Sequence, residues 1–221
     1  MNVTEAVDRL IRYFDNVNTS DGGYGNRATR TLVYLQQVYD DAENFREWQW
    51  RITTHSDTIV APASTFPLPA DYATLGRSGG VAMRVSTSDP WDTVDEDAPE
   101  LVAYQIEQQT SAVSFPDIFA IYSGVVNFPY AGTDLLYKIR YLKVPKTLQY
   151  GLGTPDTFDI PAPYHNSVLL AGTIARMARG KGDAREDWLK QYRQGLTDMV
   201  SRERSPESEA RQMPEAVPPM C

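Results

Sequence analysis

Apolar residues recur at helical spacing through the first part of the chain. A first stripe predicts a helix over residues 2–15, and its members are Val3, Val7, Leu10, Ile11 and Phe14. Asn2 and Glu5 have the spacing of a capping box, in which each side chain binds the other residue's backbone N–H. A second stripe predicts a helix over residues 26–47, with Ala28, Leu32, Leu35, Tyr39, Ala42 and Phe45 on its apolar face. The segment between them, residues 16–25, is rich in turn formers, so the pair is predicted to form an antiparallel helical hairpin.

A period of two residues replaces the helical period from Trp48 onward. Trp48 and Trp50 would point to the same side of a strand. The β-branched residues within 53–60 suit a pleated, half-buried surface. Two prolines, at positions 67 and 69, end this ladder because they lack a backbone donor, and Asp71 after them is expected at a turn or a helix start.

Further strands and one helix are predicted in the middle of the chain. Alternation at residues 81–86 predicts a strand with one buried face, formed by Val81, Met83 and Val85. Segments 118–122 and 125–128 flank Ser123-Gly124, a two-residue connection typical of a hairpin. The longest strand is predicted at residues 135–142, with one face formed by Leu135, Tyr137, Ile139 and Tyr141. Residues 99–110 fit a strand or a helix, and Pro99 favours a short helix because proline suits the first helical position.

The helical period returns at Pro163. One predicted helix presents a face of small and apolar residues suited to close packing, namely Val168, Leu169, Gly172, Ile174, Ala175 and Ala178. Asp183 and Glu186 have the spacing of a capping box for a last helix, whose buried face is predicted to be Trp188, Tyr192, Leu196 and Met199. Residues 205–221 carry four prolines and no apolar period, which predicts an extended or disordered arm.

These patterns predict an α+β protein, a helical bundle of about four main helices with a β-rich insertion between the second and third long helices. The predicted domains are a bundle formed by residues 1–47 and 163–204, an insertion at residues 48–162, and a C-terminal arm at residues 205–221. The length of 221 residues is enough for one domain of ordinary size or one with a small insertion.

Composition narrows the classes of function. The formal net charge of -8 argues against a general nucleic-acid binder, which is normally basic, but it allows a protein that surrounds DNA without gripping it. The mean hydropathy is -0.42, and no run approaches the roughly 18 apolar residues of a transmembrane helix, so no membrane span is predicted. The N-terminus alternates charged and apolar residues, unlike a secretory signal. The one cysteine, Cys221, excludes an internal disulfide.

No catalytic or cofactor motif stands out. Two histidines and one cysteine do not supply a conventional zinc site, and His165 at a helix start is expected to cap or pack. Ser64, His55 and Asp71 would make a triad on paper, but no G-x-S-x-G elbow accompanies Ser64. The glycines at 22, 23 and 25 lack the Lys-Ser/Thr of a phosphate loop, and those at 180 and 182 follow a helix. We therefore expect no catalytic residue, no cofactor and no metal.

Two segments are candidate interaction sites. One is acidic, contains no basic residue and lacks calcium-loop spacing, so we expect it to face solvent or to form a lining that repels a passing polyanion; its carboxylates are Asp89, Asp92, Asp95, Glu96, Asp97 and Glu100. The other is the apolar end of the C-terminal arm, formed by Met213, Val217, Pro218, Pro219, Met220 and Cys221.

The order of these pieces resembles the head-to-tail adaptor proteins of tailed bacteriophages. The resemblance covers about residues 1–203, and its more specific parts are Leu68-Pro69-x-Asp71-Tyr72 and the helix entry at residues 161–170. It implies a helical bundle with a projecting β segment and a ring of copies, usually twelve, which docks beneath the portal and links the capsid to the tail around a DNA channel. The implied partners are the portal protein, a tail or nozzle/stopper protein, further copies of the chain, and genomic DNA that passes without sequence-specific binding. The implied location is the virion neck at the portal vertex, after assembly in the host cytoplasm, with no membrane partner. The proline-rich arm varies in that family, so its proposed role in binding the portal does not come from a matching motif.

Three other functions remain open at this stage. A stopper or tail-completion protein would share the neck location. A carboxylate-based hydrolase would draw on the acidic segment and Asp71, although a flexible loop is a poor platform for two carboxylates at a fixed separation. A carbohydrate-binding module would use Trp48, Trp50 and Trp91.

Overall fold

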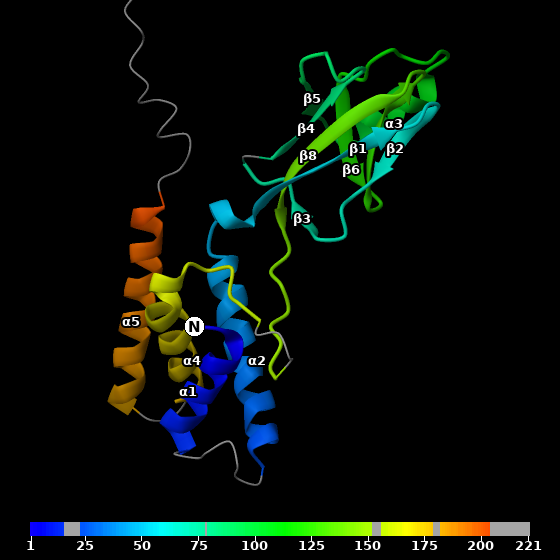
Figure 1. Cartoon of the computed structure of the whole chain (residues 1–221). Helices are drawn as coiled ribbons and strands as arrows, with labels where there is room; N and C mark the ends of the chain where they lie inside the picture. Colours follow the sequence, from blue (N-terminus) through cyan, green and yellow to red (C-terminus); the bar gives the residue numbers. More distant parts are fainter. Residues whose placement is uncertain (16–22, 78, 152–155, 179–181, 204–221) are drawn as a thin grey trace, which may run out of the picture. The chain divides into compact units, whose positions relative to one another are not determined.

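The structure is a computed structural model that describes residues 1–15, 23–77, 79–151, 156–178 and 182–203. Packing divides the chain into two compact units, one formed by residues 1–49 and 145–221 and the other by residues 50–144. We call them the helical unit and the β unit and describe each by itself (Figure 1).

The helical unit is formed by both ends of the chain. Its elements are α1 (Val3–Asp15), α2 (Tyr24–Glu43), the 3-10 turn η2 (Ala162–Tyr164), the π-helix η3 (His165–Leu170), α4 (Ala171–Met177) and α5 (Gly182–Arg202). The predicted capping box at the start of α1 is confirmed: the Asn2 backbone N–H donates to Glu5 Oε2 at 3.1 Å, and the Glu5 N–H donates to Asn2 Oδ1 at 2.8 Å. α1 packs on α2, and α4 packs on both α2 and α5 (Figure 1).

The predicted apolar faces of these helices are partly confirmed. The small-residue face of residues 168–178 is buried throughout, as expected for close packing. Phe45, assigned to the buried face of α2, is 55% exposed because the helix ends at Glu43. In α5, Leu196 and Met199 are buried, whereas Trp188 and Tyr192 are half-buried. The proposed Asp183–Glu186 capping box cannot be compared because the Asp183 side chain lies outside the described residues.

The segment that follows the β unit, residues 145–151, is held against α2 by hydrogen bonds. We call it the return segment. Gln36 donates from Nε2 to the Lys146 backbone O at 3.1 Å, and its Oε1 accepts from the Leu148 N–H at 2.6 Å. Lys146 in turn forms an ion pair with Asp156 at 3.1 Å. These contacts hold an irregular stretch against the helices without a strand or helix of its own.

The β unit contains one eight-stranded sheet and one helix. The strands follow the order β1-β8-β4-β5-β6-β7-β2, and β3 pairs with β8 beside this path. Their bounds, with those of the helix, are β1 Ile52–Ile59, β2 Ala63–Pro67, β3 Tyr72–Thr74, β4 Gly80–Arg84, β5 Asp92–Glu96, α3 Pro99–Gln108, β6 Ile118–Tyr122, β7 Val125–Ala131 and β8 Leu135–Lys143. Neighbouring strands are antiparallel except β5 and β6, which are parallel.

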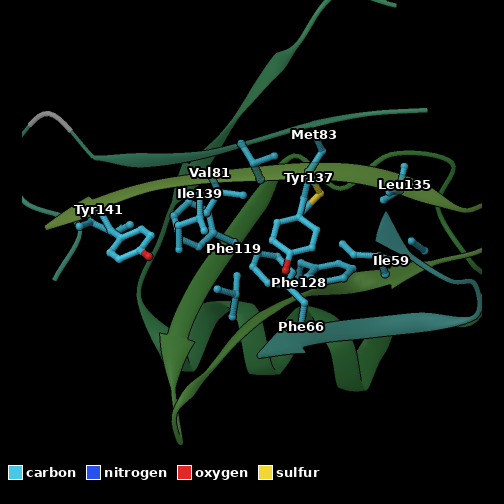
Figure 2. Packing of buried hydrophobic residues seen from close by; sticks show 14 residues of the cluster. Ile59, Phe66, Val81, Met83, Phe119, Phe128, Leu135, Tyr137, Ile139 and Tyr141 are labelled. Atoms are coloured by element: carbon cyan, nitrogen blue, oxygen red, sulfur yellow. The ribbon is translucent and has the colours of Figure 1, made fainter. Parts of the chain in front are cut away.

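The sheet curls around one apolar cluster (Figure 2). The longest strand, β8, gives it the predicted face of Leu135, Tyr137, Ile139 and Tyr141, all of which are buried. The Phe66 ring stacks on Tyr137 with the ring centroids 3.9 Å apart. The predicted β6–β7 hairpin is confirmed, and Ser123 and Gly124 have φ of 55° and 78°, the left-handed values that a two-residue turn of type I′ needs.

The predicted fold class was wrong. The chain is not a four-helix bundle with an insertion: its described residues form a barrel-like eight-stranded sheet and five α-helices, which stand mainly at the ends of the chain and after the sheet. The prediction counted residues 163–178 as one long helix, but this segment begins as a 3-10 turn and a π-helix and keeps seven α-helical residues. α3 belongs to the β unit and packs on β6 and β7. Periodicity identifies buried faces, but it does not say which faces share a core.

Local predictions around Trp48 also need correction. Gln49–Arg51 is a 3-10 turn, so Trp48 and Trp50 do not share one face of a strand. Trp48 is fully buried and Trp50 is half-buried. Asp71 lies in a turn, as one of the two expectations had it, and a short strand follows it instead of a helix. Val85 is 51% exposed because β4 ends at Arg84.

Candidate interaction surfaces

An apolar groove lies within the helical unit between α1, the segment 166–174 and α5. Its volume is about 560 Å³, and its apolar walls are Leu10, Tyr13, Leu170, Ile174 and Trp188. Leu10 and Ile174 are buried at its floor, whereas Tyr13 is 57% exposed. Arg9 and Asp198 place one cation and one anion in its lining. We call this feature the helical groove.

Two glycines bring the walls of this unit close together. A Cβ on Gly195 of α5 would lie 2.9 Å from both Ser167 Oγ and Val168 Cγ2. A Cβ on Gly172 would lie 2.6 Å from Val38 Cγ1 and 2.9 Å from Tyr192 Cδ2. Such distances are shorter than ordinary contacts, so α5 reaches its position because these residues have no side chain.

An aromatic pair joins α1 to α5 at the groove. The rings of Tyr13 and Trp188 meet edge to face with centroids 5.7 Å apart, and the Trp188 indole N–H donates to Tyr13 Oη at 3.2 Å. Both side chains remain accessible to a partner in the groove.

A polar network stabilises the other side of α1. Asp8 Oδ1 accepts hydrogen bonds from Tyr24 Oη at 2.6 Å and from Tyr150 Oη at 3.2 Å. Burial, together with the Asp8 carboxylate, raises the pKa of both tyrosines above their ordinary value of 10. The phenols therefore stay protonated donors at neutral pH, and Asp8 ties α1 to the start of α2 and to the return segment.

A second surface, on the outer face of the β unit, combines cations with an indole. Arg84 and Lys138 lie against the Trp91 ring, with their charged groups 4.3 Å and 4.6 Å from its centroid. Register places Lys138 opposite Ala82 and Arg140 opposite Gly80, on the same face of β8. Composition alone, with its net negative charge, gave no signal for this cluster.

This cluster weighs against the carbohydrate-binding alternative. Such a module needs indole faces open to a sugar ring, but cations cover the Trp91 ring and Trp48 is fully buried. Trp50, the third residue of that proposal, is half-buried at the turn before β1.

The acidic segment lies on and around β5. Asp92, Asp95 and Glu96 are exposed on the strand, and Glu100 is exposed in the first turn of α3. Asp89 is exposed in the preceding loop, where its Oδ2 accepts from the Ser86 N–H at 2.9 Å, and half-buried Asp97 accepts from the Ala98 N–H at 2.7 Å. Five of the six carboxylates therefore face solvent in the isolated chain.

The residues considered for a catalytic triad, Ser64, His55 and Asp71, lie in different structural environments. Asp71 accepts a hydrogen bond from Tyr141 Oη at 2.6 Å, and burial together with this contact raises the pKa of Tyr141 to about 12. His55 is exposed on β1, and Ser64 is half-buried on β2. The geometry therefore gives Asp71 the role of a hydrogen-bond acceptor for Tyr141 at the turn before β3.

His165 is an interior residue of the helical unit. Its Nε2 lies 2.7 Å from the Ile160 backbone O, and its ring meets Phe158 edge to face at 5.0 Å. Burial lowers the pKa of its imidazole. In the part of the chain that the structure describes, no three His, Cys, Asp or Glu side chains gather in a way that would hold a metal ion.

The described helices also include none that is long and apolar enough to cross a bilayer. The apolar end of the C-terminal arm, residues 213–221, lies outside the described residues, so its proposed contact remains a prediction.

Comparison with known proteins identifies the family of the chain. The chain matches no curated protein sequence. Residues 1–217 match the family model described as SU10 adaptor protein, a match that includes both the helical unit and the β unit. The chain therefore belongs to the SU10 adaptor protein family, a family of bacteriophage adaptors.

Proposed function

We propose that the chain is a structural virion protein, a head-to-tail adaptor whose copies form a ring that docks beneath the portal, links the capsid to the tail and leaves a channel for DNA. The observation that carries this proposal is the adaptor-family match over residues 1–217, because it includes the described residues of both compact units and most of the C-terminal arm. The proposed place of action is the neck of the virion, with assembly in the host cytoplasm.

The exposed surfaces are consistent with a subunit of an assembly. A closed ring needs two different lateral faces on each copy, because its contacts are heterologous. The β unit exposes Leu101 and Tyr104 on one side of α3, at 53% and 60%, and the helical unit exposes Val33 of α2 at 52%. Single exposed apolar residues are ordinary, but a pair spaced by three on one helix makes a face suited to a partner.

The acidic segment is proposed to face the channel. DNA binds tightly where Lys and Arg neutralise its phosphates, and carboxylates repel it. Exposed Asp92, Asp95 and Glu96 would therefore let the genome slide past without being held. An equivalent hydrolase would need two carboxylates around a cleft at a defined separation, but these side chains project from an exposed strand.

The arm, residues 205–221, is proposed to fasten the ring to the portal. Its prolines restrict the free chain, which lowers the entropy lost when an extended segment is bound. The further proposed partners are a tail or nozzle/stopper protein on the opposite side of the ring.

The test is assembly on portal rings. The purified chain and the portal protein of the same phage would be mixed, separated by gel filtration and imaged by negative staining. The proposal expects rings of the chain on one end of the portal, and a chain lacking residues 205–221 should remain folded but fail to attach. A chain that never binds portal rings but binds tail-completion proteins would favour the stopper alternative and contradict the proposal.

A further inference from the structure

The helical groove leaves apolar surface uncovered within a unit that is otherwise well packed. Tyr13, Leu170 and Trp188 all contribute to it and are exposed or half-buried. Its volume of about 560 Å³ is enough for several apolar side chains. Covering this surface would be favourable because apolar area would be removed from water.

We propose that, in the free subunit, this groove holds the C-terminal segment of the same chain, residues 213–221. The segment follows α5 in the sequence, and α5 itself forms one wall of the groove. The inference concerns the chain before assembly and does not rest on the proposed ring.

The length of the chain allows this contact. α5 ends at Arg202, and Trp188 lies fourteen residues earlier, which is about 21 Å along a helix that rises 1.5 Å per residue. The eleven residues from 203 to 213 span up to about 36 Å when extended. The arm can therefore reverse direction after α5 and bring Met213 to any part of the groove.

The side chains at the end of the arm suit the groove. Met213, Val217 and Met220 are apolar, and methionine adapts its shape to irregular apolar surfaces. Pro214, Pro218 and Pro219 favour an extended chain of about 3.1 Å per residue, in which residues 213–220 cover about 22 Å. That length is comparable with the groove wall from Trp188 to Asp198, which is about 15 Å of helix.

Charge supports the same occupant. Arg9 is exposed in the groove lining, on α1. The arm carries a carboxylate at Glu215, among the apolar residues. Because the arm is tethered to α5, its effective concentration at the groove is high, so contacts of modest strength are sufficient.

If the arm occupies the groove, the groove and any other partner compete for the arm. An arm seated in its own groove is withheld from other partners until something binds it more strongly. If the arm also binds the portal, portal binding must empty the groove, which would expose Tyr13 and Trp188 for a new contact.

Cys221 permits a direct test because it is the one cysteine of the chain. A nitroxide attached to Cys221 of the full ¹⁵N-labelled chain broadens the NMR signals of nearby protons. We expect strong loss of intensity at the Trp188 indole N–H and at the amides of Ile174 and Gln191, and little loss at Val33 on α2. Reduction of the nitroxide should restore all of these signals.

Two variants and one mixing experiment control the test. Changing Met213, Val217 and Met220 to Ser leaves the described part of the chain unaltered and should abolish the broadening at the groove. Leu170→Glu should do the same, whereas Val33→Glu, an exposed change on α2, should not. Uniform weak broadening in the full chain would overturn the inference. In the mixing experiment, ¹⁴N chains that carry the nitroxide are added to ¹⁵N chains that lack it. Broadening of the ¹⁵N signals would also overturn the inference, because the occupant of the groove would then come from another copy.

Discussion

Trp48 shows how much of the helical unit depends on one side chain. It is fully buried, and its indole N–H donates to the Ala42 backbone O at 2.7 Å, which satisfies a carbonyl near the end of α2. Truncation of this side chain would leave a large cavity and remove one of the hydrogen bonds that the Ala42 carbonyl accepts.

We therefore predict that Trp48→Ala lowers the free energy of unfolding by about 3–5 kcal/mol, measured by urea denaturation. Trp188→Ala is the matched comparison, because this tryptophan is half-buried at the helical groove. Trp188→Ala should lower the free energy of unfolding clearly less than Trp48→Ala does. Equal losses from the two substitutions would contradict the burial assigned to Trp48.

Tyr141 makes the stability of the β unit depend on pH in the alkaline range. Its folded-state pKa is raised to about 12 by burial and by the hydrogen bond to Asp71, whereas the unfolded value is near 10. Between these values the folded state holds a proton that the unfolded state has lost, so the contribution to stability is complete below pH 10 and is lost as pH rises through 12.

Tyr141→Phe removes this titrating group. The variant should be less stable than the parent at pH 8, because Asp71 loses its donor. It should also lose less stability between pH 10 and pH 12. Thermal unfolding followed by circular dichroism across this range measures both effects, and parallel pH profiles for the two proteins would refute the assignment.

Residue-level prediction from the sequence was best where the chemistry is local. The Asn2–Glu5 capping box depends on residues three apart, and both of its hydrogen bonds are present. The Asp8–Tyr24–Tyr150 network was not predicted, because it joins residues up to 142 positions apart and no spacing signals it. The cations at Trp91 were missed for the same reason.

Among the elements, α4 and α5 depend on close approach. Gly172 of α4 lies against Val38 of α2 and Tyr192 of α5, so any side chain there must displace one of them. The sequence pattern of small residues at 168–178 indicated this packing correctly.

We predict that Gly172→Ala lowers the free energy of unfolding by about 1–3 kcal/mol, because overpacking outweighs the roughly 1 kcal/mol that alanine gains in a helix. Gly25→Ala in α2 is the control, since a Cβ there meets no atom within 4 Å. It should be neutral or stabilising. Chemical denaturation of both variants provides the measurement, and a stabilised Gly172→Ala protein would show that the packing is looser than described.

Strands were predicted well where alternation and turn chemistry agreed. β8 and the β6–β7 hairpin satisfy both, with Ser123 and Gly124 in the left-handed region that the turn demands. The stretch at Trp48 had alternating tryptophans but no partner strand at that point, and it formed a 3-10 turn. Alternation indicates a strand only when a neighbour supplies the hydrogen bonds.

At the scale of the whole molecule, the carboxylates of the acidic segment lie mainly at the surface, although the backbone of β5 is paired in the sheet. Asp95 and Glu96 have exposed side chains, and Val94 just before them is the buried residue of β5. Half-buried Asp97 makes a local hydrogen bond to the next backbone N–H.

Asp95→Lys, Glu96→Lys and Asp97→Lys together should therefore leave the far-ultraviolet circular dichroism spectrum unchanged and the melting temperature within a few degrees of the parent. The same triple variant should bind double-stranded DNA more tightly at low salt than the parent, because three repulsive charges become attractive. Loss of folding would show that the segment is structural after all.

The global architecture was the least predictable part. Helical stripes at both ends correctly indicated helices, but the way a curled sheet closes depends on pairings such as β5 with β6, which local patterns do not encode. The helical groove was missed because Leu10, Ile174 and Trp188 were assigned to the core, and Tyr13 and Leu170 belonged to no predicted face. Sequence spacing shows that Leu10, Tyr13 and Trp188 are apolar, but not whether anything covers them. The acidic positions, in contrast, were identifiable from the sequence because carboxylates this dense cannot be buried together.

The central claim is that this adaptor-family chain forms a ring between portal and tail. A cryo-electron microscopy reconstruction of the portal vertex of the virion tests it most directly, with the helical unit and the β unit fitted separately into the density. The account predicts a closed ring of copies beneath the portal, with density for residues 205–221 on the portal surface and the acidic strand β5 facing the channel. A neck without density for this chain, or the chain located elsewhere in the virion, would contradict it.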